Sequence, residues 1–226
     1  PHSDKVLYDA AQLALELRNP RETSEYAQRL VRQLPGSPYA PEARLLLGDA
    51  YAMAGMEDDA RTLYVRVAQA HLNDAIGAEA YLRLARLAMT QKRYDEVITY
   101  LETRMKDAFT EQGNDQVHLL LAQAYRMKGQ RERARGILND LINFFPESEV
   151  LPDAYVELTQ VLDDLGQRED AVRLAQQAAR RYPDSPQVLR NAGELLGLEG
   201  NTLAAASMLV AADEAGANDP TLLLTA

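Results

Sequence analysis

The chain has 226 residues, of which 46% are hydrophobic and 26% charged, proportions typical of a folded globular protein rather than a disordered or collagen-like one. Its 24 Lys and Arg residues against 34 Asp and Glu residues give a formal net charge of −10, which argues against a nucleic-acid partner. Cysteine is absent, which excludes disulfides, thiolate metal sites and cysteine nucleophiles.

The sequence begins Pro-His-Ser-Asp-Lys, without the cationic and then apolar run of a secretion signal. No stretch has the ~18 apolar residues of a membrane span. We expect this to be a piece excised from a longer protein, so the missing signal does not decide the compartment of the parent protein.

Small residues recur along the chain in a small-x-x-apolar step. They stand at Ala11, Gly48, Ala85, Ala122, Thr159 and Gly193, separated by 37, 37, 37, 37 and 34 residues. A fixed period of this length indicates a repeat array, in which each repeat is one supersecondary unit.

Each repeat is predicted to be a helical hairpin. The first helix ends at Gly55, Gly129, Gly166 and Gly200 in four repeats, because glycine adopts the left-handed conformation after a helix at little cost. The second helix carries a small residue at Ala60, Ala134, Ala171 and Ala205, and four residues later it carries Tyr64, Leu138, Ala175 and Leu209. This spacing places both residues on one helix face, where the two helices cross.

The joints between hairpins contain proline followed by serine. Pro35, Pro146 and Pro183 end the second helix, and Ser37, Ser148 and Ser185 are expected to cap the next helix. The residues Asn218-Asp219-Pro220 repeat this start signal, which predicts a truncated further helix over 220–226.

These features resemble the tetratricopeptide repeat family, whose pattern joins Leu-Gly and Tyr in the first helix to Ala, an aromatic residue and Pro in the second. Residues 41–74 match best, through Leu47, Gly48, Tyr51, Gly55, Ala60 and Tyr64. The resemblance implies a single all-α array, a right-handed α-solenoid of about six stacked hairpins. Its repeats cover about 4–37, 41–74, 78–111, 115–148, 152–185 and 186–219.

Several positions depart from the family pattern. Tyr81 and Tyr155 replace its Trp, Thr159 replaces its small residue, and Lys92-Arg93-Tyr94 replaces a glycine turn. The first repeat has Arg18-Asn19-Pro20 at its turn and Thr23 at its second small position, so we expect it to be distorted or to act as an end cap.

The sequence offers no catalytic constellation, so we predict no enzyme activity, no cofactor and no metal site. His2, His71 and His118 lie in different repeats without a helical i, i+4 pairing. The adjacent carboxylates Asp58-Asp59, Asp163-Asp164 and Glu169-Asp170 are interpreted as solvated or first-turn charges, the alternative being an acid and base pair in a cleft.

Tyrosines and arginines are the other candidate ligand groups. Tyr51, Tyr64, Tyr81, Tyr125 and Tyr155 occupy repeat core positions, which favours packing over ligand stacking. A basic cluster of Arg126, Lys128, Arg131, Arg133 and Arg135 is either a solvated turn or an anchor for an acidic partner or anionic polymer. No Lys or Arg follows position 190, so the charge is polarised along the array.

The family resemblance also implies an inner wall lined by the first helices, and this wall is the expected partner-binding surface. Its residues are Leu45, Asp49, Ala52, Met53, Arg83, Arg86, Met89, Leu119, Gln123, Arg126, Met127, Val156, Glu157, Gln160, Asp163, Arg190 and Glu194. The positions that form a Lys/Asn carboxylate clamp in chaperone-binding members hold Leu45, Asp49, Leu82 and Arg86, so chaperone binding is not expected.

The spacing and the Pro-x-Ser joints resemble repeats of bacterial envelope proteins, including the periplasmic parts of exopolysaccharide exporters. This implies a non-catalytic periplasmic scaffold that binds a partner protein, such as a periplasmic enzyme or outer-membrane component, in its groove or along its edge. Two alternatives stay open: a conduit wall that binds polysaccharide directly, and a scaffold that self-assembles through its exposed ends.

Overall fold

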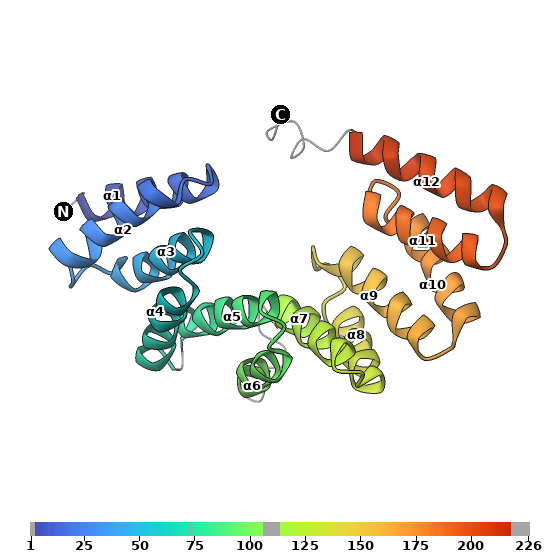
Figure 1. The fold of residues 1–226 in the computed structure, drawn as a ribbon, viewed down its shortest axis with the longest axis horizontal. Coiled ribbons are helices and arrows are strands. Elements are labelled where there is room, and N and C mark those ends of the chain that lie inside the picture. The colour runs from blue at the N-terminus through green and yellow to red at the C-terminus, as the bar shows by residue number, and fades with distance from the viewer. Residues whose placement is uncertain (1–2, 73, 106–113, 218–226) are drawn as a thin grey trace. The chain divides into compact units, whose positions relative to one another are not determined.

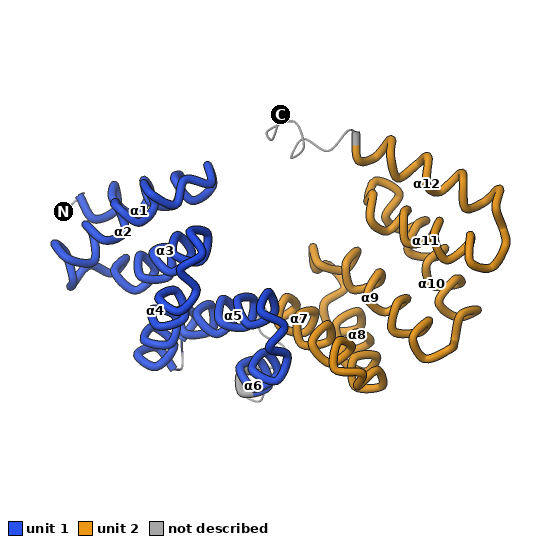
Figure 2. Tube along the Cα trace, in the orientation of Figure 1, with its two compact units in different colours: residues 1–107 blue, residues 108–226 orange. Residues whose placement is uncertain are grey.

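The computed structural model describes residues 3–72, 74–105 and 114–217, and these ranges contain twelve helices and no strand (Figure 1). The chain divides into two compact units, residues 1–107 and residues 108–226 (Figure 2). This architecture confirms the predicted all-α solenoid of helical hairpins. Among the described residues, no helix is both long enough and apolar enough to cross a membrane.

The first unit contains three hairpins. Its helices are α1 (Ser3–Glu16), α2 (Pro20–Gln33), α3 (Ala40–Met53), α4 (Glu57–Ala70), α5 (Ala75–Thr90) and α6 (Tyr94–Met105). Each helix packs against the next one along the chain, and the first helices of successive hairpins, α1, α3 and α5, also contact one another in order.

The second unit repeats this arrangement. Its helices are α7 (Asn114–Met127), α8 (Arg131–Phe144), α9 (Leu151–Asp164), α10 (Arg168–Arg181), α11 (Pro186–Leu198) and α12 (Thr202–Ala217). Again each helix packs against the next, and α9 contacts both α7 and α11. The further helix predicted over 220–226 lies outside the described residues.

The turns inside the hairpins share one backbone geometry. Gly55, Gly129, Gly166 and Gly200 have φ between 73° and 85°, as predicted for left-handed helix stops. Arg18 and Lys92 take the same conformation, with φ of 53° and 57°, at the two turns that lack glycine. The two hydrogen bonds that close the turn are kept there, since Lys92 N–H donates to the Met89 carbonyl and Arg93 N–H to the Ala88 carbonyl. Tertiary packing therefore imposes the turn even where the residue disfavours it.

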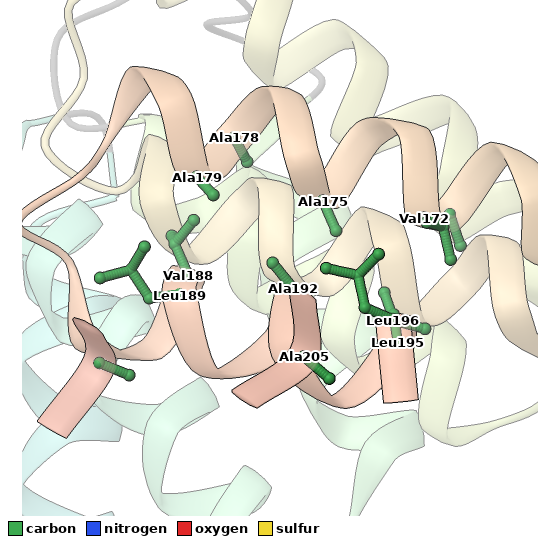
Figure 3. Close-up of a cluster of buried hydrophobic side chains, with 12 residues drawn as sticks. Val172, Ala175, Ala178, Ala179, Val188, Leu189, Ala192, Leu195, Leu196 and Ala205 are labelled. Atoms are coloured by element: carbon green, nitrogen blue, oxygen red, sulfur yellow. The ribbon is translucent and has the colours of Figure 1, made fainter. Parts of the chain in front are cut away.

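The small residues of the period lie where the helices of a hairpin cross. Ala11, Ala85 and Ala122 are fully buried, and a methyl group at Gly48 would overlap the Tyr64 ring on α4. In the last repeat, Gly193 on α11 leaves similar room for Leu209 on α12. In the second unit these close crossings join α10, α11 and α12 in one core cluster (Figure 3).

Aromatic rings support the start of several first helices. Tyr155 packs against Tyr182 with 5.8 Å between ring centroids, and His118 packs edge-on against Phe145 at 5.3 Å. Each pair lies within one repeat, and the two consecutive repeats use the same two positions, 27 residues apart. Tyr155 therefore has a packing role at the family's Trp position, as its place in the sequence predicts.

The serine joints differ from the prediction. Ser37 and Ser148 do not cap α3 and α9, whose N-cap residues Tyr39 and Val150 accept no side-chain cap bond. Each serine hydroxyl instead donates to an aspartate at the start of its own repeat, Asp4 or Asp115, and accepts the backbone N–H two residues later. Ser185 precedes α11 but makes no side-chain cap bond. Ser37 and Ser148 thus fix the joint to the hairpin before it, not to the helix after it.

Candidate functional site

The first helices of the first unit border a hollow of about 590 Å³. Helix α3 contributes Asp49, Ala52 and Met53 to its lining, and α5 contributes Arg83 and Arg86. All five are positions of the inner wall that the family resemblance implied. The structure therefore brings together residues that are 30 or more positions apart in sequence.

The hollow also has lining residues that sequence reasoning missed. Leu15 on α1 and Leu87 on α5 add apolar surface, while Glu57 and Tyr64 come from the second helix α4. Residues of second helices were not considered for the wall, because the family pattern assigns the wall to first helices. Only the spatial packing of α4 against α3 and α5 brings Glu57 and Tyr64 to this surface.

A charged network forms the floor between the two hairpins. The Arg83 Nε donates to both carboxylate oxygens of Asp49, at 2.9 and 3.0 Å, and an Nη donates to Glu79. The Tyr64 hydroxyl donates to the same carboxylate at 2.7 Å. Arg83 and Asp49 are only 19% and 18% exposed. The pair therefore joins α3 to α5, and its charges are already compensated within the protein.

The pKa directions agree with this pairing. Burial acts to lower the pKa of the Arg83 guanidinium, but the carboxylates of Asp49 and Glu79 outweigh it and the pKa is raised. Burial, together with the Asp49 charge, raises the pKa of the Tyr64 phenol, so this hydroxyl remains a hydrogen-bond donor. Chemically, the floor is a fixed ion pair and not a proton-transfer site.

The structure corrects part of the expected binding surface. Leu45 is buried in a core cluster with Tyr64 and Leu84, so it is a packing residue and not part of the wall. Met89 is half-buried on α5, whereas Met53 and Arg86 are exposed. Of the predicted wall residues in the described part of the first unit, Met53 and Arg86 are therefore the exposed ones.

In the second unit the predicted cationic residue is also paired. Arg126 on α7 donates to Glu157 on α9, which is buried, and lies 3.6 Å from Asp164. Burial acts to lower the pKa of Arg126, and Glu157 outweighs it so that the pKa is raised. Glu157 is thus not an exposed wall residue, and the predicted cationic middle is largely neutralised by neighbouring carboxylates.

The other predicted wall residues of the second unit do not converge on one site. Asp163 binds Arg168, and Arg190 lies 3.4 Å from Asp213. Gln123 and Gln160 are half-buried, and Glu194 is exposed. Three other arginines of the basic cluster also have partners. Arg131 lies 3.9 Å from Asp164, Arg135 lies 2.6 Å from Glu132, and the Arg133 guanidinium lies 5.4 Å from the Tyr125 ring centre.

One position of the repeat forms polar contacts between successive first helices. Arg83, Glu157 and Asn191 are each the sixth residue of their repeats, which begin at 78, 152 and 186, and each bonds back to the first helix of the preceding hairpin. For Asn191 the acceptor is the Thr159 hydroxyl at 2.8 Å. A polar residue at this position was the available sequence signal for a contact between repeats.

The described ranges give no support for a metal site. No cluster of three or more potential metal-ligating side chains occurs within them. His71 lies 2.8 Å from Asp74 through its Nδ1, and the His118 ring is fully buried with its Nδ1 2.6 Å from the Asn114 carbonyl. His2 lies outside the described residues.

Comparison with protein families gives three consecutive matches. A model of the tetratricopeptide repeat-like domain matches residues 3–116, and two tetratricopeptide repeat models match residues 116–148 and 152–195. The chain belongs to the tetratricopeptide repeat family. Proteins of this family generally mediate protein–protein interactions, and their fold is generally a non-catalytic scaffold. No curated protein sequence matches the chain.

Solved tetratricopeptide repeat structures resemble this one. PilF of Pseudomonas aeruginosa is 15% identical with a TM-score of 0.73, the match covering 92% of this chain and 89% of that one. MamA of Desulfovibrio magneticus RS-1 is 19% identical with a TM-score of 0.64, covering 80% and 95%. YrrB, described as a tetratricopeptide repeat protein with an unusual peptide-binding site, is 14% identical with a TM-score of 0.57, covering 87% and 95%. At these identities the likeness shows the fold alone.

Proposed function

We propose that this tetratricopeptide repeat chain is a non-catalytic scaffold that binds a segment of a partner protein in the hollow between α3 and α5. The single observation that carries the proposal is the hollow itself, about 590 Å³ in volume and bordered by residues of both hairpins. A concave surface with apolar walls and a few placed polar groups is typical of a binding site.

The chemistry of the lining supports a peptide ligand. Leu15, Met53 and Leu87 offer apolar contacts for one large aliphatic or aromatic side chain. Arg86 stands exposed at the same surface, where its guanidinium favours a carboxylate or backbone carbonyl. The Arg83–Asp49 pair supplies a rigid polar floor, which lowers the entropic cost of ordering the site on binding.

The proposed cellular setting is the bacterial periplasm, in an envelope assembly or exopolysaccharide export complex. Its support is the resemblance of the repeat spacing and the Pro-x-Ser joints to envelope proteins. Fractionation of cells that express the full-length protein tests the compartment. Recovery of the protein in the cytoplasmic fraction alone would overturn this part of the proposal without affecting the binding site.

The binding proposal has a matched pair of test variants. Met53 and Met56 are 44% and 45% exposed, and Met53 lines the hollow whereas Met56 lies outside its lining. The immobilised chain is first used to capture partners from an envelope lysate, and the captured protein is then purified for measurement of its Kd. We expect Met53→Glu to weaken binding at least about tenfold, since it places a charge on the apolar contact surface, while Met56→Glu changes the Kd less than about twofold.

Arg86→Glu provides a second test from the other side of the hollow, and circular dichroism checks that each variant is folded. Arg83→Glu is unsuitable, because it breaks the floor network and a loss of binding would then report a loss of stability. Equal affinities for wild type, Met53→Glu and Arg86→Glu would show that the partner binds elsewhere.

A further inference from the structure

Methionine is the only sulfur-containing residue type of this chain, which has six Met and no Cys. Among the methionines whose side chains the structure describes, Met53, Met56 and Met127 are 44%, 45% and 51% exposed, whereas Met89 and Met208 are half-buried. Oxidation of a thioether gives methionine sulfoxide, which methionine sulfoxide reductases convert back. The three exposed residues are therefore the described methionines most open to a peroxide.

Two of these methionines flank one hairpin turn. Met53 is the last residue of α3, and Met56 is the N-cap of α4, after the turn at Ala54 and Gly55 (Figure 1). They are three positions apart in sequence, and their exposed fractions are nearly equal. We therefore expect a small neutral oxidant to reach both side chains at similar rates.

The surroundings of the exposed methionines differ. Met53 lines the hollow of about 590 Å³ together with Leu15 and Leu87, whereas Met56 is not part of that lining. Met127 belongs to α7 in the second unit and does not line the hollow either. Of the three, Met53 is therefore the one whose modification changes the chemistry of the proposed binding surface.

We propose that Met53 is a reversible oxidation site that controls the affinity of the hollow, with hydrogen peroxide as the oxidant. The inference rests on the proposed function of the hollow as a site for an apolar side chain of a partner. In the reaction the O–O bond of hydrogen peroxide breaks, and one of its oxygen atoms forms a bond with the Met53 sulfur. The sulfur loses two electrons, and the peroxide is reduced to water.

The sulfoxide opposes binding because it places a polar group on an apolar contact. The thioether sulfur is only a weak acceptor, so the unmodified side chain is covered by an aliphatic or aromatic group at little cost. The sulfoxide oxygen is hydrated in the free protein and loses its water when such a group covers it. If the oxygen accepted a hydrogen bond from Arg86 instead, that guanidinium would be withdrawn from the partner. Both cases lower the affinity.

The fold itself is expected to tolerate the modification. Met53 is 44% exposed at the end of its helix, so the added oxygen can stay in water in the free protein. Oxidised wild type and equally oxidised Met53→Leu should therefore have the same urea midpoint. A lower midpoint for the oxidised wild type would assign the loss of binding to unfolding and overturn the proposal.

The binding test compares wild type with Met53→Leu and Met56→Leu, in which a side chain of similar size replaces the thioether. Each protein is treated alone with hydrogen peroxide, desalted, and titrated with the partner protein purified in the binding test. The readout is the Kd after treatment divided by the Kd before it, so any effect of the substitution on the untreated protein cancels. We expect a ratio of at least about ten for wild type and Met56→Leu, and below about two for Met53→Leu. Methionine sulfoxide reductases should restore the wild-type Kd.

Mass spectrometry of the treated wild type reports which methionines carry oxygen, and the peroxide concentration is raised until Met56 is oxidised. An unmodified Met53 at that point would overturn the proposal. So would an unchanged Kd once Met53 is oxidised, or equal ratios for wild type and Met53→Leu. Failure of the proposed function is distinguishable, because Met53→Glu would then leave the Kd of the untreated protein unchanged. Weaker binding by Met53→Glu without any effect of oxidation would overturn the oxidation site alone.

Discussion

Removing the Asp49 carboxylate is expected to destabilise the first unit by about 1.5–2 kcal/mol. Asp49 accepts hydrogen bonds from Arg83 at 2.9 and 3.0 Å and from Tyr64 at 2.7 Å. Hydrogen bonds to charged groups contribute about 1.5–3 kcal/mol, and solvent access to the pair favours the lower end of that range. Glu79 still binds Arg83 after Asp49→Ala, so the loss stays below the ~3–5 kcal/mol of an orphaned buried charge.

A double-mutant cycle isolates the pair. Asp49→Ala with Arg83→Met should cost about 1–2 kcal/mol less than the sum of the single variants, because the second change removes a charge that the first left poorly paired. The exposed pair of Asp170 and Arg173 is the control, and Asp170→Ala should change stability by less than about 0.5 kcal/mol.

Urea unfolding followed by circular dichroism and tyrosine fluorescence measures these values, since the chain has no Trp. If the two units unfold in separate transitions, the shift is read from the transition that responds to Asp49→Ala. A coupling energy below about 0.3 kcal/mol, or equal losses for Asp49→Ala and Asp170→Ala, would refute the claim that this network holds α3 to α5.

Three further predictions concern local geometry. Lys92→Gly should stabilise the protein by about 0.5–1 kcal/mol in the same urea assay, because Lys92 has φ of 57°. Gly129→Ala should destabilise the protein by a similar amount. Equal stabilities of the two variants would contradict the argument that these turns require a left-handed backbone. Gly48→Ala should cost about 1–3 kcal/mol, since its methyl group overlaps the Tyr64 ring, and an unchanged urea midpoint would show that the ring moves freely. Hydrogen bonds from the Gly77 N–H and from His71 lower the pKa of Asp74. The Asp74 charge therefore stabilises the fold above the ordinary pKa of the group, and this stability is lost as pH falls through the lowered value. Asp74→Asn should show a weaker fall in stability below about pH 4, and an unchanged pH profile would count against this cap.

The repeat period, the helical hairpins and their ends could be predicted from the sequence, because they depend on local properties. Gly55 and its counterparts adopt a left-handed backbone that other residues disfavour, and small residues at a fixed period mark the helix crossings. The prediction of serine caps was wrong for a reason that is not local. Ser37 and Ser148 have a second acceptor within reach, an aspartate 33 residues earlier, which no local pattern reveals.

Which wall residues remain available to a partner was decided only by the tertiary structure. Arg83 and Asp49 look like free charges in the sequence, but they are 34 residues apart and meet because α5 packs against α3. Leu45 alternates with wall residues and is nevertheless buried by the neighbouring hairpins. The sequence by itself determined a tetratricopeptide array, since backbone preferences and hydrophobic spacing act within one repeat. The contacts between repeats determined which of its charges are compensated.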